Sequence, residues 1–250
     1  MFWTLTAAHA EEFVVIHVEP AVPDLVAGAV YGSEGGSPEF VFVPSGVKVA
    51  LLGEDGTSYI VEGRAAVEAS HDGLAGFRVP ADQENDEGLL ARMFGVAGLS
   101  ETTAAGRAIP NDKRGQVDEA EPGARLPLFI EFLPKLAEGG TFCLFSDSLF
   151  VRRIDSRFLD RIRVEVGGRT LEEDLKPGAI ALRFTGLGIG ENEKVKLTLA
   201  TKRDVHEIAV QRLPAGVLEG SNFDRVARLA KHGCTLQALM AAEGADGKAE

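Results

Sequence analysis

The 250-residue sequence has only two cysteines and no excess of positive charge, and each lack argues against a class of protein. Cys143 and Cys234 lie far apart and form no CxxC spacing, so we interpret them as reduced, buried thiols. The formal net charge is −12 at pH 7. Because binding to a phosphate backbone requires a cationic surface, we expect no nucleic-acid partner.

Long apolar runs are also missing from the sequence. No stretch approaches the roughly 18 apolar residues that a membrane span requires, so we expect no span. Ala8-His9-Ala10 has the small residues of a signal-peptide cleavage site, but no basic residue precedes it and the apolar stretch before it is short. The expected location is therefore the cytoplasm, or a virion if the chain is part of a particle.

The excess of acidic residues is confined to the first half of the chain. Residues 1–122 include 7 basic and 20 acidic residues, a net charge of −13, whereas residues 123–250 include 19 and 18, a net charge of +1. The polar segment 111–123 lies at the junction and has few apolar residues to bury. We therefore predict an acidic β-rich domain over residues 1–122 and a β-meander domain with C-terminal helices over residues 123–250.

Alternating apolar and polar residues dominate the second half. In residues 161–166 every second residue is apolar, which is typical of a strand with one buried face, and Gly167-Gly168 suits a tight hairpin turn. The alternation recurs in residues 180–184, 194–199 and 205–213, which predicts a β-meander. One antiparallel sheet is expected to bury the apolar residues of the first three runs, namely Ile162, Val164, Val166, Ile180, Leu182, Phe184, Val195, Leu197 and Leu199.

The first half is predicted to contain short strands, and the C-terminal region two helices. The turns Asp55-Gly56 and Glu62-Gly63 separate predicted strands over residues 47–52, 58–61 and 65–69, and each turn is typical of a hairpin. Ser221 is expected to cap a helix that ends at Gly233, and a second helix follows over residues 235–242. The predicted fold class is mainly β, or β-rich α+β, with antiparallel meander or sandwich-like sheets, a few short helices and a C-terminal helical segment.

Three patterns have the residues of a known kind of site but lack its context. The glycines of residues 185–190 follow a strand, as in a phosphate-binding loop. The residues after them alternate between polar and apolar instead of opening a helix, which predicts a hairpin or bulge.

The sequence Ser70-His71-Asp72 contains the residue types of a hydrolase triad. They are chain neighbours, however, and neighbours cannot form the relay of such a triad. Asp204 and His206 share a strand face, but zinc normally requires three or four protein ligands. We therefore predict no cofactor and no metal, and we name no catalytic residue.

Six arginines form the densest cationic stretch of the chain. Acidic residues lie among them, so one interpretation is a solvated sheet face that is neutralised by its own carboxylates. The other interpretation is a docking face for an acidic protein surface, since a guanidinium group binds a carboxylate through two parallel hydrogen bonds. The candidate interaction residues are Arg152, Arg153, Arg157, Arg161, Arg163 and Arg169.

These patterns favour a non-enzymatic structural or assembly subunit that acts through protein–protein contacts, either by self-assembly or in a larger complex. An acidic half beside a half with a basic patch suits repeated head-to-tail contacts. A virion or tail-like particle is the first expectation, on analogy alone. Two alternatives stay open: a hydrolase-like enzyme whose site combines Asp204 and His206 with distant acids, and a β module that binds a ligand.

Overall fold

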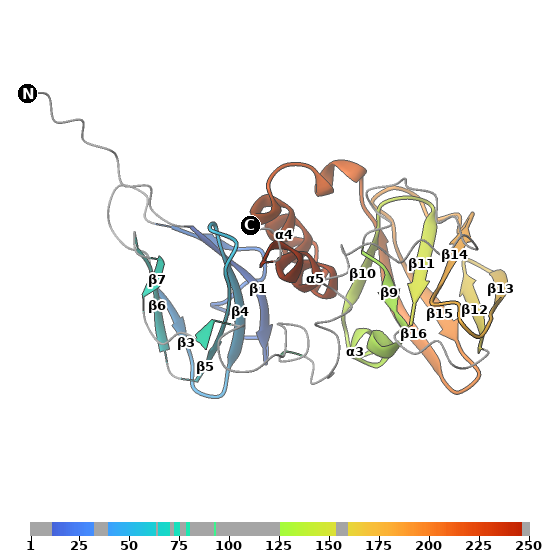
Figure 1. Cartoon of the computed structure of the whole chain (residues 1–250), viewed down its shortest axis with the longest axis horizontal. Helices are drawn as coiled ribbons and strands as arrows, with labels where there is room; N and C mark the ends of the chain where they lie inside the picture. The colour runs from blue at the N-terminus through green and yellow to red at the C-terminus, as the bar shows by residue number, and fades with distance from the viewer. Residues whose placement is uncertain are drawn as a thin grey trace, which may run out of the picture.

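The computed structural model describes residues 12–32, 40–63, 65–70, 73–75, 79–80, 93, 126–153 and 160–246. Two groups of β-strands lie on either side of a pair of helices (Figure 1). We call strands β1–β8 the first β unit, strands β9–β16 the second β unit, and α4 with α5 the helix pair. The predicted fold class, mainly β with a C-terminal helical segment, is confirmed.

The first β unit contains two antiparallel sheets, with the strand orders β2-β1-β4-β5-β8 and β3-β6-β7. The hairpin predicted at Asp55-Gly56 is confirmed by the antiparallel pairing of β4 with β5. The hairpin predicted at Glu62-Gly63 is wrong, because β5 pairs with β8, whereas β6 pairs with β3 and β7. The strand bounds are Phe13–Glu19 (β1), Val30–Tyr31 (β2), Phe40–Val43 (β3), Lys48–Gly53 (β4), Ser58–Glu62 (β5), Ala65–Ser70 (β6), Gly73–Ala75 (β7) and Val79–Pro80 (β8).

Successive residues of β1 point into two different hydrophobic cores, because side chains alternate between the faces of a sheet. Phe13 and Val15 belong to the core that includes Val41 of β3, inside the first β unit. Val14 and Ile16 belong to the core that also contains the helix pair and the second β unit. The five-stranded sheet of the first β unit is therefore buried on both faces.

The second β unit is a sandwich of a five-stranded sheet, β10-β16-β15-β12-β13, and a three-stranded sheet, β14-β11-β9. Strand β10 runs parallel to β16, and the other pairs of the five-stranded sheet are antiparallel. The strand bounds are Leu128–Phe129 (β9), Thr141–Leu144 (β10), Ser148–Arg152 (β11), Asp160–Val166 (β12), Arg169–Leu175 (β13), Ala181–Thr185 (β14), Lys194–Ala200 (β15) and Val205–Arg212 (β16). The short helices η3 (Ile130–Phe132) and α3 (Leu133–Ala137) connect β9 to β10.

The predicted single sheet of the second half is only partly right. Strands β12 and β15 pair and bury their apolar residues, as expected, except that Val195 is only half-buried. Strand β14, however, pairs with β11 in the three-stranded sheet, so Phe184 is buried from the opposite layer of the sandwich. Leu182 of β14 and Ile180 just before it were also predicted to be core residues, but both are only half-buried. Alternation shows that a strand has one buried face, but it does not show to which of two facing sheets the strand belongs.

The two predicted C-terminal helices are confirmed as α4 (Asn222–Lys231) and α5 (Thr235–Asp246), preceded by η4 (Ala215–Leu218). Ser221 caps α4 in a capping box with Asp224, and Gly233 follows the helix with a φ of 75°. Helix α4 packs on β1, and α5 contacts β1, β5 and β10. Among the described helices, none is long and apolar enough to cross a membrane.

Candidate functional site

Two of the six candidate arginines have side chains that are held within the second β unit. Arg153 is buried and donates hydrogen bonds of 2.8 Å to the carbonyl oxygens of Lys176 and Ala179. It therefore fixes the connection between β13 and β14. Arg152 lies over the ring of Phe129, 5.7 Å from the ring centre, and burial lowers the pKa of its guanidinium group.

The accessible arginines, Arg161 and Arg163, lie on the β12–β13 hairpin and already contact carboxylates. Arg161 donates to Asp174 over 2.8 Å, and this hydrogen bond raises the pKa of Arg161 and lowers that of Asp174. Arg163 lies 3.1 Å from Glu165 and 3.9 Å from Glu172. The pairs of Arg161 with Asp174 and of Arg163 with Glu172 follow from the strand register, which places these residues opposite each other. Glu165 is two residues after Arg163 in β12, so both side chains lie on the same face of the strand.

The remaining two arginines do not extend this pair. Arg169 donates a hydrogen bond of 3.1 Å to the carbonyl oxygen of Gly186. Arg157 lies outside the described residues. The structure therefore brings Arg161 and Arg163 together on one exposed face, which continues across β15 and β16, where Lys196 donates to Glu207 over 2.6 Å.

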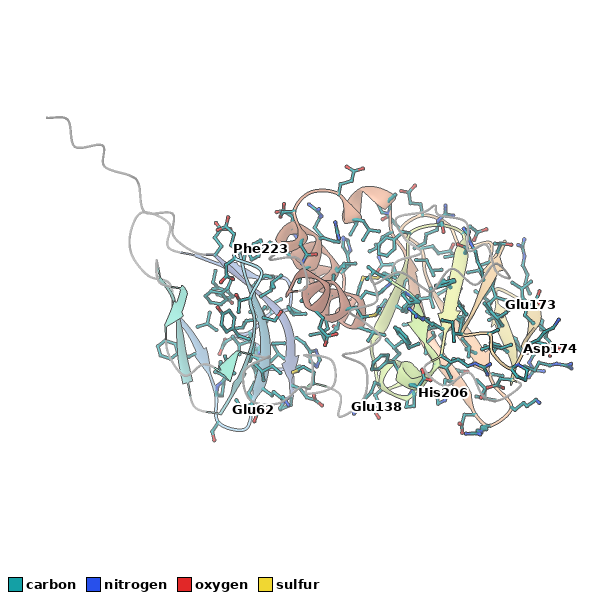
Figure 2. The ribbon with its side chains drawn as sticks, in the orientation of Figure 1. Glu62, Glu138, Glu173, Asp174, His206 and Phe223 are labelled. Atoms are coloured by element: carbon teal, nitrogen blue, oxygen red, sulfur yellow. A yellow bond between two sulfur atoms is a disulfide. The ribbon has the colours of Figure 1, made fainter. Side chains whose placement is uncertain are left out.

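The hairpin that carries Arg161 and Arg163 lies at the end of the molecule away from the first β unit (Figure 1). Figure 2 shows Asp174 of the hairpin and Glu62 of the first β unit on opposite sides of the folded molecule. The helix pair and the remaining strands of the second β unit lie between them. The two arginines are therefore out of reach of the described acidic residues of their own first β unit.

The glycine-rich loop between β14 and β15 has backbone N–H groups that are bound by carboxylates of the chain itself. The N–H groups of Gly188 and Ile189 donate to Asp147 Oδ1 over 2.9 and 3.2 Å. The N–H group of Gly190 donates to Glu193 Oε2 over 2.6 Å. No helix follows the loop, since the next element is β15. The hairpin predicted here is wrong, because β14 and β15 belong to different sheets. The loop is a connection between the two sheets that side chains hold in place, and not a phosphate cradle.

The other candidate groups do not assemble into a larger cluster in the described part of the chain. Asp204 is exposed just before β16, and His206 is half-buried opposite Leu199. Residues 12–63 contain a second pair, in which His17 lies 4.0 Å from Glu19 and burial lowers the pKa of His17 against the opposing effect of Glu19. Within the residues that the structure describes, no three His, Cys, Asp or Glu side chains form a potential metal site.

The serine of the Ser70-His71-Asp72 sequence is the last residue of β6. It pairs with Gly73, the first residue of β7, while His71 and Asp72 lie outside the described residues. The predicted strand end before a turn agrees with this pairing.

One contact between distant residues was missed by the sequence analysis. Cys143 and Cys234 are buried, as predicted, but the prediction that they are reduced is wrong because a disulfide joins them. They are 91 residues apart in sequence, and the packing of α5 against β10 brings them together. Their sequence spacing held no signal of this pairing.

Comparisons with known proteins identify no relative of this chain. No family model, no curated protein and no solved structure matches it.

Proposed function

We propose that this chain is a non-enzymatic structural or assembly subunit that acts through protein–protein contacts. The observation that supports the proposal is that two accessible arginines and a more strongly acidic β unit lie at opposite ends of the molecule (Figure 1). Residues 12–32 and 40–63, in the first β unit, contain six acidic residues and one lysine, a net charge of −5. At the far end, the hairpin of β12 and β13 carries the accessible Arg161 and Arg163, each paired with a carboxylate, and residues 160–175 contain three basic and five acidic residues, a net charge of −2.

The contact that this arrangement favours is head-to-tail, between the hairpin of one copy and the acidic first β unit of the next. Two acidic ends repel each other, so charge disfavours the symmetric contact through the first β units. The exposed pairs contribute only about 0–1 kcal/mol each, so they set orientation more than affinity.

Exposed apolar side chains lie on both ends and are suited to supply affinity. Val205 is 64% exposed and lies in the same row across the sheet as Arg163, because Ala200 pairs with both residues. At the other end of the molecule, Phe42 of β3 is 71% exposed. A contact that buries these side chains gains about 25 cal/mol for each Å² of apolar surface removed from water.

Lateral pairing of β13 between two copies is a less favourable route to assembly. Strand β13 ends the five-stranded sheet and has the consecutive acids Glu172, Glu173 and Asp174. Antiparallel pairing of two such edges places carboxylates opposite carboxylates, which opposes association. The charged edge therefore favours contact through the sheet face instead.

A repeated head-to-tail contact produces either a closed ring or an open filament. Among particles built in this way, we propose a virion or tail-like particle as the setting, by analogy with other β-rich assemblies. The disulfide argues against a cytoplasmic location, because disulfides are rare in reducing compartments.

Sedimentation velocity of the purified chain over a range of concentrations tests the proposal. We expect concentration-dependent association that weakens at high salt, because the Debye length falls from about 10 Å at 0.1 M to about 3 Å at 1 M. The variant Arg161→Glu/Arg163→Glu should associate roughly tenfold more weakly, which corresponds to about 1.4 kcal/mol. Its thermal midpoint should change little, since exposed ion pairs contribute little to folding.

The matched control is Arg161→Lys/Arg163→Lys, which keeps both charges and removes the forked geometry. It should retain most of the association if charge orients the contact. A wild-type chain that sediments as a monomer at every concentration and salt would reject the assembly proposal and leave the arginines as part of a solvated sheet face.

A further inference from the structure

Strand β10 is the edge of the five-stranded sheet, and a side chain of α5 covers its open side. Gln237 is fully buried and contacts the backbone of Cys143 twice. The Cys143 N–H group donates to Gln237 Oε1 over 2.7 Å, and Gln237 Nε2 donates to the Cys143 carbonyl oxygen over 2.6 Å. The amide thus replaces the neighbouring strand that an edge residue lacks.

The disulfide attaches the same helix to the same strand residue. Cys234 directly precedes α5 and is bonded to Cys143, so it lies three positions before Gln237. Residues three apart lie on one side of a helix, so the covalent bond and the two hydrogen bonds act on one side of α5. Both cysteines are at most 1% exposed.

We propose that the disulfide and Gln237 form a clasp that fixes the helix pair to the second β unit, and that the chain matures where thiols are oxidised. Non-covalent packing alone joins the helix pair to the first β unit, through α4 on β1 and α5 on β1 and β5. The clasp therefore holds the helices in place for their packing against the first β unit. This inference is independent of the assembly proposal.

Formation of the clasp requires an oxidant of the small-disulfide class, such as glutathione disulfide. The thiolate of one cysteine attacks the disulfide, forms a mixed disulfide and releases one glutathione thiolate, which takes up a proton. The thiolate of the second cysteine then attacks the bonded protein sulfur and releases the second glutathione. The two cysteines lose two protons and two electrons in total, and one glutathione disulfide becomes two glutathione molecules.

The burial of both sulfur atoms implies that the clasp persists once it has formed. A reductant has to approach a sulfur atom, and here α5 must first move away from β10. In a reducing compartment such a bond is rare, whereas in an oxidising one it constrains the unfolded chain over a loop of 91 residues.

The first test measures the thiols of the wild-type chain refolded with a mixture of reduced and oxidised glutathione. The refolded protein is denatured, alkylated with iodoacetamide with and without prior reduction, and weighed by mass spectrometry. We expect no alkylation without reduction and two additions after it. We also expect that incubation of the folded protein with dithiothreitol leaves the bond intact far longer than the same treatment in denaturant. Two alkylated cysteines without reduction, or equal reduction rates in both states, would overturn the proposal.

The second test compares thermal unfolding of the oxidised wild type with that of two variants. Cys143→Ser/Cys234→Ser should unfold about 5–15 °C lower, given the usual contribution of a disulfide and the size of the chain. Gln237→Leu keeps the volume and the disulfide but leaves two backbone groups of Cys143 without partners, so we expect a decrease of about 3–10 °C. If either midpoint equals that of the wild type, that part of the clasp is rejected. If the double variant does not fold, the alkylation and reduction measurements on the wild type still decide the question.

Discussion

At the scale of single residues, acids that lie among the candidate functional residues are engaged in holding the fold. Asp147 shows this most clearly, because its carboxylate accepts hydrogen bonds from two backbone N–H groups of the glycine-rich loop. The backbone carbonyl of Asp147 also accepts from the N–H group of Gly186 over 3.0 Å. The loop therefore owes its shape to a residue that precedes it by about forty positions.

Removal of the Asp147 carboxylate should destabilise the chain. We expect Asp147→Ala to lower the free energy of unfolding by about 1–3 kcal/mol, since two N–H groups lose a charged acceptor and one of them, on Ile189, is partly shielded from water. Asp147→Asn is the matched control, because its amide oxygen can still accept both bonds, and it should lose less than half as much. Urea unfolding followed by circular dichroism measures both. An alanine variant as stable as the wild type would show that water replaces the carboxylate without cost.

At the scale of elements, the helix pair packs against strands of both β units. Helix α5 is enclosed on all sides, since buried residues occur at nearly every described position along it. Its buried residues include Leu236, Ala238, Leu239, Met240, Ala241 and Ala242. The loop before β2 approaches the end of α4 so closely that only a glycine fits. A Cβ atom on Gly28 would lie 2.5 Å from the Cα atom of Lys231.

The substitution Gly28→Ala should therefore weaken the packing of α4 on the first β unit. We expect a loss of roughly 2–5 kcal/mol, which combines about 1–2 kcal/mol for a positive φ with about 1–3 kcal/mol for a clash between two backbones. Gly46→Ala is the matched control, because Gly46 has a φ of 79°, close to the 83° of Gly28, but nothing lies within 4 Å of its added Cβ atom. It should lose only about 1–2 kcal/mol, the cost of the backbone conformation alone. Equal losses in thermal or urea unfolding would mean that the approach of Gly28 to Lys231 is not part of the native contact.

Sequence patterns predicted the elements better than their partners. The alternation in β12 and β15 and the Ser221 cap of α4 are local signals, so they could be identified from neighbouring residues. Strand β13 was not identified because six of its seven residues are exposed or half-buried on a sheet edge, which leaves little apolar alternation. The assignment of β14 to the second sheet and the Cys143–Cys234 bond depend on packing between distant segments, which local spacing does not encode.

At the candidate site, too, local sequence patterns did not predict contacts between distant residues. The sequence identified the stretch of arginines and the acids among them, but not which arginines point inward. Nothing in the sequence distinguishes Arg153 from the neighbouring arginines. Its structural role comes from its position beside the carbonyl groups of Lys176 and Ala179, which are more than twenty residues away in the sequence. The accessible pair, Arg161 and Arg163, is defined by the alternation of β12, which a strand prediction does provide.

At the scale of the whole molecule, the two β units are joined through a shared core. One hydrophobic cluster contains Val14 and Ile16 of the first β unit, Leu229 and Leu239 of the helix pair, and Val164 of the second β unit. A domain boundary near residue 122 stays a prediction, because that segment lies outside the described residues. The C-terminal helices nevertheless pack against both β units, which lie on either side of them.

Differential scanning calorimetry of the oxidised wild-type chain tests this coupling most directly. Because the helix pair shares one core with both β units, we expect a single unfolding transition whose calorimetric and van't Hoff enthalpies agree. Two resolved transitions, one for each β unit, would contradict the account, since the ends of the molecule would then be free to move independently.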